Sequence, residues 1–128
     1  MSKQIINTVK APAPIGPYSQ AVKTGNLLFV SGQIAIDPQT NELVTGNIKE
    51  ETNQVMKNLK MILEEALLNL DQVVKTTILL SDMRLFAEVN EIYGSYFNGR
   101  YPARETFAAK GLPKGVNVEI SVIATFNE

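Results

Sequence analysis

The 128-residue chain contains no cysteine and no histidine. The absence of cysteine excludes disulfides, thiolate nucleophiles and zinc–sulfur sites. The absence of histidine removes the side chain that most often performs acid–base chemistry near neutral pH, and also the commonest metal ligand. Any catalysis by this chain must therefore come from carboxylates, arginine, lysine, tyrosine, hydroxyls, backbone groups or water.

The chain also lacks a strong charge bias and a long apolar run. Its net charge is −1, with basic and acidic residues interleaved along the whole length. Nucleic-acid binding needs a basic patch to neutralise phosphates, so we expect no nucleic-acid partner. No apolar run approaches the roughly 18 residues of a spanning helix, and residues 1–10 contain no signal-peptide core. We therefore expect a cytoplasmic protein with no membrane partner.

The composition that is present is typical of one globular domain. Apolar residues make up 45% of the chain and charged residues 20%, which is ordinary for a folded protein and excludes wholesale disorder. A chain of this length can form one domain with a hydrophobic core and is too short for two such domains. Because no repeat, linker or low-complexity segment is visible, we predict a single domain over residues 1–128.

The clearest predicted element is a helix that begins after Asn47. Asn47 followed by Glu50 is typical of an N-cap with a capping box, and Glu51 adds negative charge to the first turn. Apolar residues then recur at three- and four-residue spacing, which places them on one face of a helix. They are Val55, Leu59, Ile62, Leu63, Ala66, Leu67 and Leu70.

The remaining segments predict a loop, four strands and a second helix. Residues 11–17 contain three prolines and should form an extended loop. Asp82 is expected to cap the second helix, which ends at Asn98 and Gly99. Strands are expected at residues 27–30, where Ser31-Gly32 closes the strand, and at residues 73–80, 103–109 and 116–126.

This order of elements predicts an α+β fold with two layers, in which a mixed β-sheet carries both helices on one face. The other face of the sheet must be buried against something else. In the last strand that second face is mixed rather than fully polar. Its residues are Asn117, Glu119, Ser121, Ile123 and Thr125. We therefore predict a homo-oligomer whose subunits meet around a partly wet site.

Arg104 and Glu119 are the pair best suited to chemistry. A hairpin between the strand at 103–109 and the last strand would place them on neighbouring strands with the same facing. Pattern alone favours a surface ion pair by about two to one, worth at most roughly 1 kcal/mol. However, Arg104 stands at a strand entrance and Glu119 inside an apolar strand. A guanidinium there offers a fork for a small carboxylate, and the glutamate could polarise a water molecule.

Other candidate positions leave two interpretations open. Tyr18 follows a stiff loop, and its ring could pack with its hydroxyl in water as readily as it could serve a site. Ser31 and Gly32 could present backbone groups to a ligand, although a plain strand-ending turn is favoured by roughly three to one. Asn90 lies one position beyond the apolar stripe of the second helix, where a solvent-facing side chain is the ordinary outcome.

Several segments together make the chain resemble the RidA (YjgF) family over nearly its whole length. The segments are residues 13–20 (APIGPYSQ), 31–33 (SGQ), 86–90 (FAEVN), 102–104 (PAR), and 112–114 (LPK) followed by 118–120 (VEI). The resemblance implies a chorismate-mutase-like fold and a homotrimer with inward-packed sheets and three sites between subunits. It also implies hydrolytic deamination of 2-iminopropanoate and 2-iminobutanoate to 2-keto acids and ammonia.

The resemblance also implies roles for single residues. Arg104 would clamp the substrate carboxylate, Glu119 would orient the attacking water, and the backbone N–H of Thr106 would help to hold the carboxylate. The other residues of the pocket would be Tyr18, Ser31, Gly32 and Asn90. Because an imine carbon is already electrophilic, positioning and electrostatics can supply the rate, and no metal, cofactor or covalent nucleophile is required.

One position departs from the family pattern. Relatives often read Arg-Ser-Cys where this chain has Arg104, Glu105 and Thr106. A thiol-dependent chaperone role, suggested for some relatives, is therefore put in doubt. We expect deaminase activity to survive, because the backbone at this position matters more than the thiol, although the substrate preference is expected to shift.

Two other function classes compete with the imine deaminase. The first is a non-catalytic regulatory protein that binds small carboxylates on the same fold without turnover. The second is a ribonuclease or translation inhibitor, a label that older members of this family received. The near-neutral charge, the missing histidine and the lack of a basic aromatic surface argue against the ribonuclease.

Overall fold

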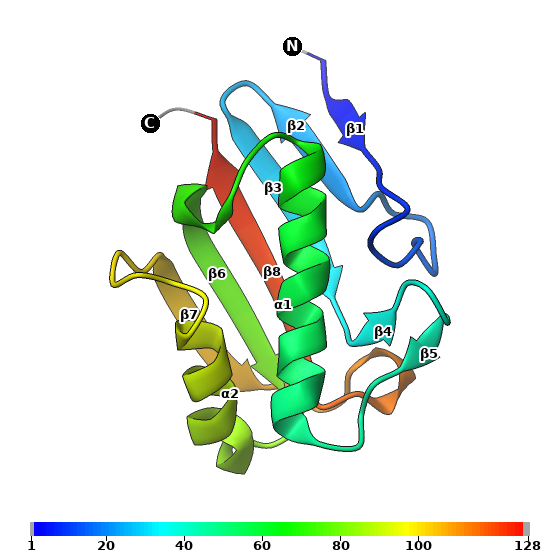
Figure 1. Cartoon of the computed structure of the whole chain (residues 1–128), viewed down its shortest axis with the longest axis vertical. Helices are drawn as coiled ribbons and strands as arrows, with labels where there is room; N and C mark the ends of the chain where they lie inside the picture. Colours follow the sequence, from blue (N-terminus) through cyan, green and yellow to red (C-terminus); the bar gives the residue numbers. More distant parts are fainter. Residues whose placement is uncertain (1, 127–128) are drawn as a thin grey trace.

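The structure is a computed structural model and describes residues 2–126. Its main sheet has six strands in the order β1-β2-β3-β8-β6-β7 (Figure 1). The strands are β1 (Gln4–Ile6), β2 (Ala21–Thr24), β3 (Leu27–Gln33), β6 (Val73–Leu80), β7 (Ala103–Ala108) and β8 (Val118–Thr125), and β4 (Ile36–Asp37) and β5 (Glu42–Leu43) form a separate small sheet. The helices are α1 (Ile48–Glu65) and α2 (Phe86–Gly94), with short 3-10 turns η1 (Leu70–Gln72), η2 (Met83–Leu85) and η3 (Pro113–Gly115).

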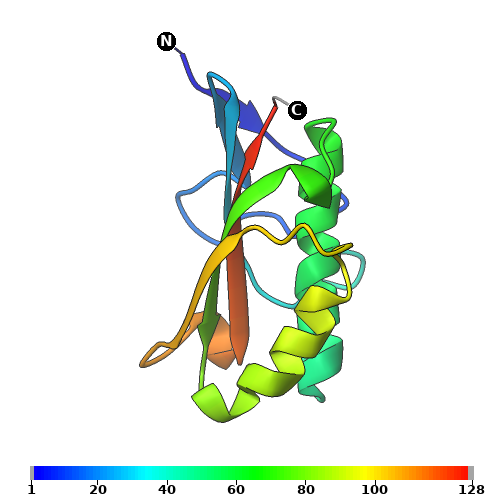
Figure 2. The same ribbon diagram turned by 90° about the vertical axis from the view of Figure 1, so that its left-hand side faces the viewer.

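The predicted α+β class is confirmed. Strands β6 and β7 pair in parallel and the other pairs of the main sheet are antiparallel, so this sheet is mixed. Seen edge-on, both α-helices lie on one face of the sheet, and within residues 2–126 the other face carries no α-helix (Figure 2). Within residues 2–126, no helix is long and apolar enough to cross a membrane. The trimer remains a prediction.

Helix α1 begins where the sequence predicted. The side chain of Asn47 accepts hydrogen bonds from the backbone N–H groups of Lys49 (2.8 Å) and Glu50 (3.2 Å) and so caps the helix. Six of the seven residues of the predicted apolar stripe are buried, as expected from the spacing. Leu67, however, was wrongly included in the stripe. The helix ends at Glu65, and Leu67 has a left-handed backbone (φ 64°) and is 91% exposed.

Strand β8 shows the predicted alternation. The residues that face the helices are buried, namely Val118, Ile120, Val122 and Ala124. The uncovered face of the sheet carries Leu27, Phe29 and Phe107, which are 38%, 40% and 51% exposed. These residues form an apolar surface that one chain alone does not bury.

The predicted hairpin between residues 103–109 and the last strand is wrong. Strand β8 lies between β3 and β6, and among the described strands β7 pairs only with β6. The cause is the β6–α2–β7 crossover, because a strand, helix and strand of this kind return as parallel neighbours. The segment after β7 then passes the end of β6, where Ala109 N–H bonds to Leu80 C=O and Ser81 N–H bonds to Asn117 C=O (both 2.9 Å).

Candidate functional site

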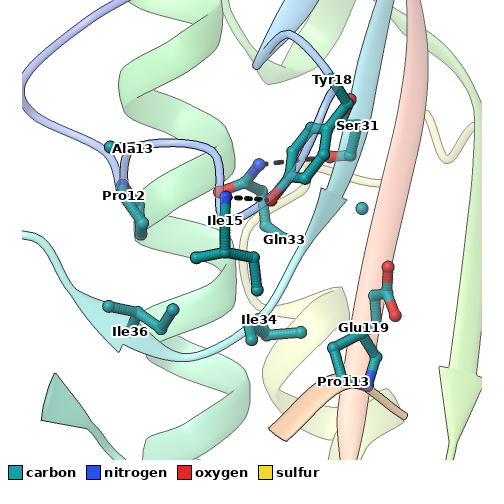
Figure 3. Close-up of a pocket in the computed structure, with 11 residues that line it drawn as sticks. Pro12, Ala13, Ile15, Tyr18, Ser31, Gln33, Ile34, Ile36, Pro113 and Glu119 are labelled. Carbon is teal, nitrogen blue, oxygen red and sulfur yellow. Dashed lines mark hydrogen bonds between the residues drawn. The ribbon is translucent and has the colours of Figure 1, made fainter. Parts of the chain in front are cut away.

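A pocket of about 260 Å³ lies where β3, the start of β8 and two loops meet (Figure 3). One loop is the proline-rich segment before β2, and the other is η3, which contributes Pro113. The apolar lining residues are Pro12, Ala13, Ile15, Ile34, Ile36 and Pro113, and the other lining residues are Tyr18, Ser31, Gly32, Gln33 and Glu119. This pocket therefore contains four of the seven candidate site residues, namely Tyr18, Ser31, Gly32 and Glu119.

Glu119 lies directly against Gly32. A Cβ atom added to Gly32 would lie 2.0 Å from Glu119 Oε2 and 2.8 Å from Glu119 Cδ, so any side chain at position 32 would overlap the carboxylate. The sequence interpretation of Ser31-Gly32 as a strand end was wrong. Strand β3 continues to Gln33 through a register shift between Val30 and Gln33, and glycine is needed there for the close approach.

The carboxylate of Glu119 is available to a ligand. It is half-buried, and within residues 2–126 it forms no hydrogen bond or ion pair with another side chain or the backbone. Burial raises the pKa of this carboxyl above its usual value, because the charged form loses solvation. An acceptor of this kind can hold a water molecule and take a proton from it more readily than an exposed glutamate.

The proline-rich segment is a loop, as predicted, and it forms the opposite wall of the pocket. The hydroxyl oxygen of Tyr18 accepts a hydrogen bond from the N–H of Ile15 (3.2 Å), and the side chain of Ile15 points towards Ile34 (Figure 3). The Ser31 hydroxyl donates to the C=O of Ser19 (2.6 Å) and so joins β3 to the loop. The ring of Tyr18 therefore faces the pocket, whereas the Ser31 hydroxyl is engaged in holding the loop.

Arg104 lies in a second hollow, beside α2. Its guanidinium Nη1 donates to Asn90 Oδ1, and its Cζ lies 5.4 Å from the ring centroid of Tyr93 and 5.5 Å from that of Phe86. Tyr93 is itself fixed, because its hydroxyl donates to Thr76 Oγ1 (2.9 Å). Two aromatic rings and one amide thus hold the guanidinium, and its other N–H groups make no hydrogen bond within the part of the chain that the structure describes.

Sequence reasoning missed this arrangement around Arg104. Asn90 is solvent-exposed, as the ordinary interpretation held, but its amide oxygen also orients Arg104. Phe86 and Tyr93 were not among the predicted site residues. Residues 86, 90 and 93 are spaced so that they share one face of a helix, which could have indicated a common partner. That partner could be identified only once β7 was known to pack beside α2.

Thr106 lies on the free edge of the sheet. Ala109 N–H bonds to Leu80 on β6, and backbone groups of alternate residues in a parallel strand point to opposite edges. The N–H of Thr106 therefore points away from β6, which leaves it available to a ligand or a second chain. Its side-chain oxygen Oγ1 is buried and has no hydrogen-bond partner in the described structure.

A single chain does not bring Arg104 and Glu119 together, contrary to the predicted facing. Arg104 pairs with Thr76, which is buried beneath α2, so it lies on the helix-covered face. Glu119 alternates with buried neighbours in β8 and lies on the uncovered face, and β6 separates the two strands. The candidate residues therefore form two groups, one around Glu119 and one around Arg104.

Comparison with known proteins identifies the family. A family model described as Endoribonuclease L-PSP matches residues 8–126. The chain belongs to this family, also called RidA or YjgF. This RidA-family chain is 53% identical to a RutC family protein of Pyrococcus abyssi over 97% of the chain and 98% of that protein.

Two further relatives bear on chemistry. A Mus musculus protein named 2-iminobutanoate/2-iminopropanoate deaminase is 49% identical, over 95% of the chain and 90% of that protein. The crystal structure of E. coli TdcF with bound serine superposes with a TM-score of 0.91 at 37% identity, over 95% of the chain and 98% of TdcF. The fold and nearly the full length are thus shared with proteins of this family.

Proposed function

We propose that this RidA-family chain hydrolyses small 2-imino acids, such as 2-iminopropanoate and 2-iminobutanoate, to 2-keto acids and ammonia. The observation that carries the proposal is the unpartnered carboxylate of Glu119, held against Gly32 in a small pocket. The name of the mouse relative, which is a deaminase of these substrates, supports the same reaction. The serine bound to TdcF supports a ligand of amino-acid size.

The complete site is proposed to form between two copies of the chain. A 2-imino acid carries a carboxylate, but the described residues that line the Glu119 pocket include no lysine or arginine. Arg104 has free N–H groups in the second hollow, and a guanidinium binds a carboxylate at two points. A homotrimer that places Arg104 of one subunit beside Glu119 of the next would supply both groups to one substrate.

In this shared site each residue has a separate role in the reaction. Arg104 and the N–H of Thr106 hold the substrate carboxylate, and Glu119 holds a water molecule beside the imine carbon. Glu119 takes a proton as the water oxygen bonds to C2, giving a carbinolamine, and the same proton passes to the nitrogen. Glu119 then takes the proton of the new hydroxyl group and passes it to the nitrogen, so that the C–N bond breaks, ammonia leaves and C2 becomes a carbonyl. Positioning and electrostatic stabilisation supply the rate.

A dehydratase-coupled assay tests the reaction. A pyridoxal-phosphate dehydratase that releases 2-iminobutanoate is combined with the chain, and the appearance of 2-oxobutanoate and ammonia is followed. We expect the chain to accelerate both. Saturable binding of 2-oxobutanoate in calorimetry without acceleration would instead indicate the non-catalytic carboxylate-binding protein.

A complementation experiment tests the shared site. Arg104→Ala and Glu119→Gln should each abolish acceleration, whereas Arg84→Ala, a control at an exposed arginine, should not. When the two inactive variants are mixed at equal amounts during refolding, each intersubunit site draws Arg104 and Glu119 from different chains. About one quarter of the sites then contain both native residues, so about one quarter of the activity should return. Mixed oligomers without activity would show that no such shared site exists.

The description of the family model as an endoribonuclease suggests the competing activity. The apolar pocket and the near-neutral charge do not favour it. Cleavage of RNA by the purified chain that is lost in Glu119→Gln would support the ribonuclease and contradict our proposal.

A further inference from the structure

Glu51 is a buried carboxylate that the proposed reaction does not use. It lies in the first turn of α1 and is 0% exposed, whereas its neighbour Glu50 is exposed. Within residues 2–126 it forms no ion pair with lysine or arginine. A buried carboxylate without a cation is costly unless N–H groups satisfy its oxygens. Its hydrogen-bond partners therefore indicate what it does.

All the hydrogen bonds to the Glu51 carboxylate come from the segment that starts β8. Oε2 accepts from the backbone N–H groups of Asn117 (2.7 Å) and Val118 (3.1 Å), and Oε1 accepts from the side-chain amide of Asn117 (3.1 Å). Asn117 is also tied to the end of β6, because its C=O and Oδ1 accept from the N–H and hydroxyl of Ser81 (both 2.9 Å). Helix α1, β6 and β8 are thus joined at Asn117.

Glu119 follows this joined segment directly, and β3 does not hold the segment in place. The register of β3 with β8 shifts at the bulge and ends at the pair Gln33 and Ile120. The backbone of residues 117–118 is therefore fixed by β6 on one side and by Glu51 on the other. The Glu119 carboxylate already lies against Gly32 and cannot move closer to it. A displacement of this backbone would therefore move the carboxylate away from its position beside Gly32.

We infer that Glu51 is a positioning residue for Glu119. By binding the N–H groups of Asn117 and Val118, it fixes the backbone from which Glu119 reaches Gly32. The catalytic readout of this inference rests on the proposed deaminase function. The position of the start of β8 also depends on the length of the Glu51 side chain, and this dependence can be measured without activity.

Two substitutions separate the reach of Glu51 from its charge. Glu51→Asp keeps the charge but is one methylene too short to bond both backbone N–H groups. Glu51→Gln keeps the length and one acceptor oxygen. In the full-length oligomer we expect kcat of Glu51→Asp to fall on the order of tenfold or more, as small displacements of a catalytic group do. KM should change by less than about twofold, because the carboxylate clamp is on β7.

The controls exclude general effects of charge and burial. Glu51→Gln should rescue kcat to within about threefold of the original chain, since both backbone N–H groups remain bonded. Glu50→Asp, at the exposed neighbour, and Thr52→Val, at the buried neighbour, should leave kcat unchanged. Thr52 is 0% exposed, but its hydroxyl bonds only to the C=O of Ile48 in its own helix.

Several outcomes would overturn the inference. They are an unchanged kcat in Glu51→Asp, an equal loss in Glu51→Gln, or the same loss in Thr52→Val. If Glu51→Asp does not fold, Asn117→Ala removes the side-chain links to Glu51 and Ser81 and should lower kcat at constant KM. An unchanged kcat in that variant would also overturn it.

A failure of the proposed function is distinguishable from a failure of this inference. If the original chain accelerates no imine hydrolysis, amide hydrogen exchange by NMR still tests Glu51. Exchange at Asn117, Val118 and Glu119 should be faster in Glu51→Asp than in Thr52→Val, with the remainder of the core unaffected. Equal exchange at these three amides would contradict the positioning role.

Discussion

At the scale of single residues, the site depends on side chains that are fixed in position but still have hydrogen-bonding groups available to a ligand. Glu119 is fixed against Gly32 and has no hydrogen-bond or ion-pair partner within residues 2–126. Arg104 is held by Asn90 and two aromatic rings, and its remaining N–H groups make no hydrogen bond in the described part of the chain. A group that is already positioned loses little freedom when it binds substrate, so more of its interaction energy is available to the reaction.

The contact between Gly32 and Glu119 leads to a prediction at this scale. In Gly32→Ala the added methyl would occupy the place of the carboxylate, which lies 2.0 Å from the new Cβ. The carboxylate must move, so kcat should fall by about 100-fold or more while the chain remains folded. Steady-state kinetics and circular dichroism measure the two properties.

Gly46→Ala is the matched control, because nothing lies within 4 Å of the Cβ that it would add. It should retain the original kcat. Equal activity in Gly32→Ala and Gly46→Ala would show that the position of the Glu119 carboxylate is not important for the reaction.

At the scale of elements, one buried side chain holds the loop that forms the wall of the pocket. Gln20 is 2% exposed. Its side chain accepts from the N–H of Thr8 (2.7 Å) and donates to the C=O groups of Thr8 (3.0 Å) and Pro12 (2.8 Å). The loop contains little regular structure of its own, so its shape depends on this anchor and on the hydrogen bond from Ser31 to Ser19.

Removal of this anchor should weaken both stability and substrate binding. Gln20→Ala leaves partly buried backbone groups of Thr8 and Pro12 without their side-chain partner, which should lower the free energy of unfolding by about 1–2 kcal/mol. It should also raise KM, because Tyr18 is displaced with the loop. Urea denaturation and steady-state kinetics measure these effects. Gln39→Ala, at an exposed glutamine, should change neither, and an equal KM in both variants would contradict the proposed role of the loop.

At the scale of the whole molecule, the face of the sheet opposite the two α-helices carries apolar residues that the chain leaves exposed. Leu27, Phe29 and Phe107 are each more than one third exposed on it. Apolar residues gathered on one face of a soluble chain mark an interaction surface. Strand β7, which carries Arg104, is an edge strand whose outer side pairs with no strand of the described residues. Both features support the proposed assembly of several copies.

A charge on this face should prevent assembly and with it activity. Phe29→Asp would place a carboxylate in the buried interface, where desolvation of the charge costs several kcal/mol. We expect light scattering to give three times the mass of the chain for the original protein and the mass of one chain for this variant. Imine hydrolysis should be lost in parallel. Val9→Asp is the control, because Val9 is 94% exposed.

A trimeric Phe29→Asp variant would contradict the proposed use of the sheet face. A monomeric variant with full activity would contradict the shared site instead. The two results are therefore informative about different parts of the proposal.

Prediction from the sequence succeeded where the determinant is local. The cap at Asn47, the stripe of α1, the loop at residues 11–17 and the alternation of β8 follow from neighbouring residues within one element. The short strands β1, β2, β4 and β5 were not predicted, since they lack a long apolar run. Glu51 was interpreted as a charge on the first turn, because its burial depends on a strand 66 residues later.

The sequence by itself determined the residue types available for chemistry and the period of each element. With no cysteine or histidine, the side-chain groups that remain for chemistry are carboxylates, hydroxyls, amides, amines and guanidinium groups, and this follows from composition. The tertiary structure alone decided which of these groups meet. The α2 crossover placed β6 between Arg104 and Glu119 and turned them to opposite faces. Neighbour relations in a sheet are set by the packing of distant segments, and no local pattern records them.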